Sequence, residues 1–293
     1  MFAAARVSAL CVAAVGLACG GSTRATLPPP PDPDVGPVLL GSESFHVPGE
    51  VLVWRVKWKG ILGGTTSLVV GEPGVLDGHE AIIVRSETRG DGLVAVFRHV
   101  RDELTTMIDL ERGVPIKAEA VVEKGRSVRF VEAVFSDRGY RVTRRYGGSE
   151  PAKWEQSVPE GARAHDLHST MAHVRLWDPE PGTRAYLYAQ SGESFYRIDV
   201  VAAGVETLRT ELGEVAARRV EGTATPYDRN GEPKAGADLR TFMAWFSTDE
   251  ARVPLRIVAD TTYGKVYAEL ANYQQPAGKA LRLDHTSPAP APD

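Results

Sequence analysis

The chain has 293 residues, of which 43% are hydrophobic and 25% are charged, and its formal net charge is −4. This composition is that of a globular protein long enough to bury a hydrophobic core. The acidic balance excludes the strongly basic surface on which nucleic acid binding depends. We therefore expect no nucleic acid partner.

The N-terminus has the proportions of a bacterial export signal. Arg6 supplies a positive charge, and the apolar run 7–17 is shorter than the roughly 20 residues that cross a bilayer. Leu17-Ala18-Cys19-Gly20 resembles the site at which lipoproteins are cleaved and lipidated, although Gly16 stands where that pattern prefers Leu. This predicts a signal peptide over 1–18 and lipid on Cys19. The alternative is ordinary cleavage near Ala25, which would release a secreted periplasmic protein.

Proline separates this signal from the rest of the chain. Residues 26–37 read TLPPPPDPDVGP, which favours an extended polyproline spacer. We expect a lipid-anchored linker over 19–44, a single β-rich domain over 45–275 and a disordered tail over 276–293. Both cysteines, Cys11 and Cys19, precede the domain, so it has no disulfide.

Alternation of apolar and polar residues predicts that the domain is mainly β. In 51–59, Leu52, Trp54 and Val56 share one face while charged residues occupy the other. Glycine, proline and aspartate separate this run from similar ones. The predicted strands are Val51–Lys59, Thr65–Val70, Glu80–Thr88, Leu93–His99, Ile116–Val122, Val128–Phe135, Phe195–Val201, Val215–Gly222, Phe242–Ser247, Leu255–Thr261 and Val266–Tyr273.

One segment has helical spacing instead. Leu167, Met171 and Val174 recur at helical intervals within Asp166–Trp177, with Asp166 positioned to cap the first turn. Many strands and one short helix predict a curved antiparallel sheet, or an open or closed barrel-like domain, with the helix inside.

The domain contains an internal repeat. Residues 112–117 (RGVPIK) match residues 251–256 (ARVPLR), and acidic residues precede both. We interpret each copy as an acidic turn followed by a proline that opens a strand. This predicts two similar halves, about 45–150 and 185–275, and gives Asp109 a structural role.

At this point the sequence resembles a bacterial envelope family known as domain of unknown function 3108. The resemblance rests on 48–50 (PGE), 58–61 (WKGI), 100–102 (VRD), 166–167 (DL) and 254–256 (PLR), in that order. The last of these also resembles, more loosely, the lipoprotein-carrier superfamily, in which a curved sheet encloses an apolar groove. Neither resemblance implies catalytic residues.

The sequence nominates no catalytic residue, cofactor or metal. His165 and His168 are three apart and share a face of the predicted helix, whereas His173 lies off it, so the zinc ligand set is incomplete. No nucleophile elbow or phosphate-binding loop is present. We interpret the aromatic residues as core rather than cavity lining; they are Trp54, Trp58, Trp177, Tyr186, Tyr188, Phe195, Tyr196, Trp245 and Phe246.

These observations predict a non-catalytic lipoprotein of the cell envelope, tethered to a membrane through Cys19. Gly20 in place of Asp after the cysteine favours the outer membrane, on its periplasmic or surface face. The expected role is binding or envelope maintenance, with an apolar ligand or an envelope protein as partner. Two alternatives stay open: a hydrolase acting on envelope polymer or lipid, and a structural docking scaffold.

Overall fold

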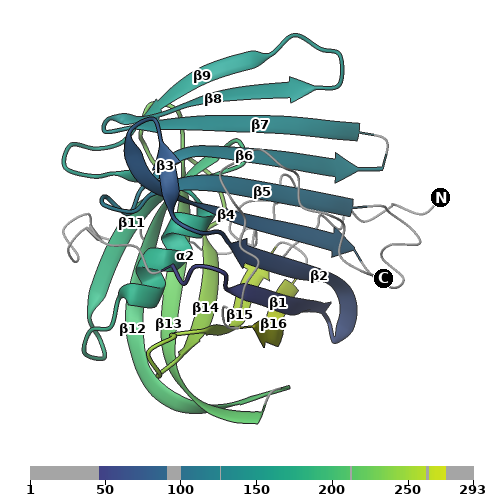
Figure 1. Ribbon diagram of the computed structural model, residues 1–293, viewed down its shortest axis with the longest axis vertical. Helices are drawn as coiled ribbons and strands as arrows, with labels where there is room; N and C mark the ends of the chain where they lie inside the picture. Colours follow the sequence, from purple (N-terminus) through teal and green to yellow (C-terminus); the bar gives the residue numbers. More distant parts are fainter. Residues whose placement is uncertain (1–45, 91–99, 126, 212, 262–263, 275–293) are drawn as a thin grey trace.

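The computed structural model describes residues 46–90, 100–125, 127–211, 213–261 and 264–274. They form a single sheet of 16 strands and one α-helix, α2 (Leu167–Leu176) (Figure 1). No helix in these residues is long and apolar enough to cross a membrane. The predicted signal peptide, Cys19, the linker and the tail lie outside the described residues.

The strands follow one another along the chain. They are β1 (Val51–Trp58), β2 (Ile61–Val70), β3 (Gly74–Leu76), β4 (His79–Gly90), β5 (Val100–Asp109), β6 (Pro115–Lys124), β7 (Ser127–Ser136), β8 (Gly139–Tyr146), β9 (Ala152–Ser157), β10 (Ala164–His165), β11 (Arg184–Ser191), β12 (Ser194–Thr210), β13 (Gly213–Tyr227), β14 (Arg240–Ser247), β15 (Pro254–Thr261) and β16 (Gly264–Gln274).

Neighbours in the sheet are mostly neighbours in sequence. The order runs from β10 to β16, continues through the antiparallel pair β16–β1, and ends at β9, while the short β3 pairs only with β4. Among these pairs, β10–β11 alone is parallel. The sheet is open between β9 and β10, so the mainly β, barrel-like prediction is confirmed in its open form.

The sequence located many of these strands. Ten of the predicted runs fall on observed strands, whereas the predicted strand Leu93–His99 lies outside the described residues. β3, β5, β8, β9, β10 and β11 were not predicted, and β12 and β13 are longer than the predicted strands.

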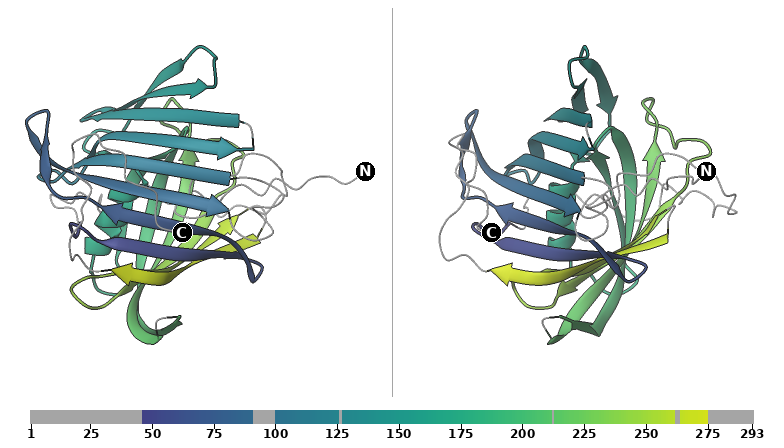
Figure 2. Two further views of the ribbon diagram at one scale, coloured as in Figure 1. Left: turned by 45° about the vertical axis from the view of Figure 1, so that its right-hand side comes forward. Right: turned by 90° about the vertical axis from the view of Figure 1, so that its right-hand side faces the viewer.

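The sheet curves around α2, as Figure 2 shows. Leu52, Trp54 and Val56 of β1 point into the interior, as their alternation predicts. Ile198 and Val200 of β12, with Phe246 of β14, pack with α2 in a second core cluster. The helix therefore occupies the concave side of the sheet.

The β11–β12 end of the sheet is covered on both faces. Leu187 and Ala189 belong to the cluster around α2. On the opposite face, Tyr188 and Phe195 pack with residues of β6, β7 and β8, including Tyr140, whose ring centroid lies 5.8 Å from that of Phe195. Two-sided burial explains the continuous buried run 187–190.

The two repeated turns have the predicted chemistry. Asp109 Oδ1 accepts the backbone N–H of Arg112 at 2.9 Å, and Asp249 Oδ1 accepts that of Arg252 at 3.1 Å. The strands that follow both begin with proline, as predicted. Gly113 and Arg252, at equivalent positions, share a left-handed backbone, with φ of 63° and 45°.

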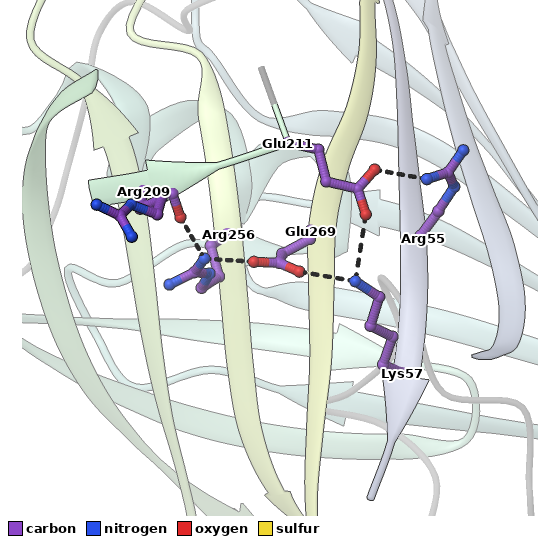
Figure 3. A network of polar contacts seen from close by, with 6 residues as sticks. All are labelled: Arg55, Lys57, Arg209, Glu211, Arg256 and Glu269. Carbon is purple, nitrogen blue, oxygen red and sulfur yellow. Dashed lines mark hydrogen bonds and ion pairs between the residues drawn. The ribbon is translucent and has the colours of Figure 1, made fainter. Parts of the chain in front are cut away.

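A charged network fastens the tip of the β12–β13 hairpin to the outer face of the sheet (Figure 3). Glu211, beyond the end of β12, binds Arg55 at 2.6 Å and Lys57 at 3.2 Å. Lys57 also contacts Glu269 at 3.1 Å, and these hydrogen bonds raise the pKa of Lys57. Arg256 donates to the backbone oxygen of Arg209 at 2.8 Å. Because the groups are partly exposed, each pair contributes little to stability.

Candidate functional site

The first turn of α2 is bonded to the inner face of the sheet. Asp166 and Ser169 form a capping box, which confirms Asp166 as the N-cap. The other carboxylate oxygen of Asp166 accepts a hydrogen bond from Thr106 of β5. Thr106 Oγ1 lies 2.8 Å from His168 Nδ1, and His168 Nε2 lies 2.8 Å from Ser86 Oγ of β4.

The direction of these bonds fixes the protonation of His168. Thr106 has one hydroxyl proton and gives it to Asp166, so it accepts from His168 Nδ1–H. Burial lowers the pKa of His168, although the nearby Asp166 acts against this, so the ring is neutral and its Nε2 accepts from Ser86. The chain of four polar groups is thus fully satisfied inside the core.

The second half of α2 carries a buried ion pair. Arg175 donates to both carboxylate oxygens of Glu50 at 2.8 and 2.9 Å, and the two side chains are 4% and 0% exposed. Arg175 also donates to the backbone oxygens of Ala251 and Arg252, at 2.7 and 3.1 Å. A bidentate pair of this kind fixes geometry as well as charge.

Two arginines cover the C-terminus of α2. Arg218 of β13 donates to the backbone oxygen of Arg175 at 3.0 Å, and Arg252 donates to that of Leu176 at 2.5 Å. Both also pair with Asp178, at 2.6 and 3.1 Å. They satisfy carbonyl groups that have no partner within the helix and complement its dipole.

The histidine cluster differs from its predicted arrangement. His165 lies in β10, before the helix, so it does not share a helical face with His168. Its ring packs against that of His173, with the two ring centroids 4.6 Å apart. His173 donates to the backbone oxygen of Gly113, in the first repeated turn, at 2.7 Å. Within the described ranges, no three His, Cys, Asp or Glu side chains are grouped as metal ligands.

A pocket opens on the concave side beside α2. We call it the inner pocket; its empty space, including the part open to solvent, is about 680 Å³. Apolar atoms make up most of the surface of its wall. The lining residues are Ser86, Thr88, Asp102, Glu103, Leu104, Ala118, Ala120, Val122, Arg129, Val131, Leu167, Gln190, Ser191 and Gly192.

The two-residue β11–β12 turn closes one side of this pocket. Gly192 has the positive φ, 59°, that such a turn takes at its first position. Glu193 follows it and pairs with Arg129 of β7 at 2.9 Å and with Arg144 of β8. These ion pairs hold the turn against β7 and β8.

Six of the nine aromatic residues that we interpret as core are buried, whereas Trp58, Trp177 and Tyr186 are half-buried. Trp54, Tyr196 and Phe246 are nearly inaccessible, and no aromatic residue lines the inner pocket within the described part of the chain.

The polar residues around α2 and at the rim of the inner pocket were not predicted from the sequence, because they are far apart along the chain. They are Glu50, Ser86, Thr106, Arg129, Arg144, Arg175 and Glu193.

Comparison with protein families identifies the chain. It belongs to the family described as protein of unknown function (DUF3108), whose sequence model matches residues 53–271. This confirms the first resemblance seen in the sequence. No protein with curated annotation matches the chain.

Solved structures are similar to the chain at low sequence identity. A β-barrel-like protein of domain of unknown function DUF1849 from Brucella abortus superposes with a TM-score of 0.50 and 12% identity, over 78% of this chain and 97% of its own. A candidate exported protein with a YmcC-like fold from Bacteroides fragilis has a TM-score of 0.36 and 8% identity, over 79% and 99% of the two chains. A candidate lipoprotein from Parabacteroides distasonis has a TM-score of 0.33 and 8% identity, over 82% and 99%.

Arg175→Met tests the buried ion pair. It leaves the carboxylate of Glu50 buried without its counter-ion, so we expect a loss of about 3–5 kcal/mol in the free energy of unfolding. Arg209→Met, in the exposed pair with Glu214, serves as control and should cost at most about 0.5 kcal/mol. Urea denaturation measures both, and equal effects would contradict the assignment.

The buried histidines predict acid sensitivity. Burial lowers the pKa of His165, His168 and His173, so below pH 6.5 the unfolded chain binds more protons than the folded one. Stability should therefore fall as the pH drops below 6.5, by up to about 1.4 kcal/mol per pH unit for each histidine. In His173→Gln, whose amide can still donate to Gly113, urea titrations should give a shallower slope; an unchanged slope would count against this account.

Proposed function

We propose that this member of the DUF3108 family is a non-catalytic, lipid-anchored binding protein of the cell envelope, which holds an apolar ligand in the inner pocket. The pocket carries this proposal, because six of its lining residues are apolar: Leu104, Ala118, Ala120, Val122, Val131 and Leu167. Concave, mainly apolar pockets with a few polar groups are the usual form of small-molecule sites.

The location of the pocket supports a binding role. One wall is the inner face of β4–β7, another is Leu167 of α2, and the β11–β12 turn closes the rim. The bonds from α2 to Ser86, Thr106 and Glu50 hold that wall in place without a ligand. A preformed pocket lowers the entropic cost of binding.

The contact between Ser86 and His168 is the observation that favours the hydrolase alternative. Ser86 lines the pocket and donates to a neutral histidine. In this arrangement His168 Nδ1 contacts Thr106, and the carboxylate of Asp166 is 4.0 Å away. We propose that this chain of hydrogen bonds from Ser86 to Asp166 anchors α2. Covalent labelling of Ser86 by a fluorophosphonate would instead favour an enzyme.

Filling the pocket should weaken binding. The neutral fluorescent probe N-phenylnaphthylamine should bind the purified protein saturably, and Ala120→Phe should weaken that binding by roughly tenfold or more, about 1.4 kcal/mol. Val121→Phe is the matched control, because the next residue of β6 points to the opposite face of the sheet. Equal effects of the two variants, or no probe binding, would contradict the proposal.

Cys19 should decide where the protein is found. We expect the chain in the membrane fraction, with the mass of a lipidated N-terminal cysteine, and we expect Cys19→Ser to move it to the soluble fraction. Fractionation of cells followed by intact-mass measurement checks both points. An unlipidated protein that starts near residue 26 would support cleavage near Ala25.

A further inference from the structure

Two arginines lie at the rim of the inner pocket and share one carboxylate. Arg129 and Arg144 lie on the inner face of neighbouring strands, and both guanidinium groups pair with the single carboxylate of Glu193. Each guanidinium offers five N–H donors, and Glu193 offers two oxygen atoms. Donors therefore exceed acceptors at this rim, and the Nε atoms of both arginines are buried without a hydrogen-bond partner.

Aromatic contacts hold Arg144 in position, and both arginines are partly buried. The Arg144 guanidinium lies 4.9 Å from the ring centroid of Tyr146 and 5.9 Å from that of Trp154, so aromatic contacts fix its position. The side chains of Arg129 and Arg144 are 17% and 29% exposed, which weakens screening by solvent. Planar guanidinium groups suit the two oxygens of a carboxylate.

We propose that the ligand is a single-chain fatty acid, whose carboxylate binds Arg129 and Arg144 in exchange for Glu193 while its chain enters the inner pocket. This inference rests on the proposed function and names its ligand class. Glu193 itself shows that a carboxylate fits between the two arginines. Release of Glu193 would free the β11–β12 turn from β7 and β8.

The charge beside the rim favours a carboxylate over a phosphate monoester. Asp102 also lines the pocket, one strand away from Arg129 across Val122, and it disfavours a doubly charged phosphate head group.

A charged probe and its neutral analogue test this directly. At pH 8 the purified protein should bind a dansyl-labelled fatty acid more tightly than its methyl ester, which has the same chain without the charge. Arg129→Gln and Arg144→Gln should each weaken binding of the acid by roughly tenfold and leave the ester unchanged. Glu193→Gln removes the competing carboxylate and should tighten binding of the acid several-fold.

Arg145→Gln is the matched control for Arg144→Gln, because Arg145 is the next residue of β8 and is exposed on the opposite face. It should leave binding of both probes unchanged, and retained ester binding shows that each variant is folded. Equal binding of acid and ester by the unaltered protein would overturn the inference, as would equal weakening by Arg144→Gln and Arg145→Gln. If neither probe binds, the proposed function itself fails.

Discussion

The buried pair between Arg175 and Glu50 is the contact on which the arrangement of this fold depends. It joins α2 to the residue before β1, 125 positions away, in surroundings where either charge alone would be costly. Arg175 and His173 also donate to the equivalent backbone oxygens of the two repeated turns, at Arg252 and Gly113. The helix thus binds both halves of the sheet by the same kind of contact.

An open sheet of this size needs such a link. The hydrogen-bonded strand order ends at β9 and β10 without closing into a barrel. The curvature of the sheet therefore depends on packing against α2 and on the contact between β8 and β12 through Tyr140 and Phe195. Packing against α2 takes the place of the hydrogen bonds that would join the two edge strands in a closed barrel. It also leaves a space beside Leu167 that the sheet does not fill, and this space is the inner pocket.

Sequence patterns predicted those parts of the fold that have one buried face. β1 and β16 alternate because one side meets the core and the other meets solvent. β11 was missed because α2 covers one face and β6–β8 the other, which removes the alternation. β5 was missed because its inner face carries Asp102 and Thr106. The candidate site could not be predicted, since its charged residues meet only through the register of the strands and lie scattered along the chain.

We propose two roles for the polar groups of the interior: those on α2 hold the wall of the pocket in place, and those on the rim select the ligand. Native mass spectrometry of the protein, released gently from its own cells, tests the central claim of ligand binding most directly. We expect a one-to-one complex carrying the added mass of a single-chain carboxylic acid, and we expect Ala120→Phe to reduce its amount. Only ligand-free protein, under conditions that preserve a known protein–lipid complex, would contradict it.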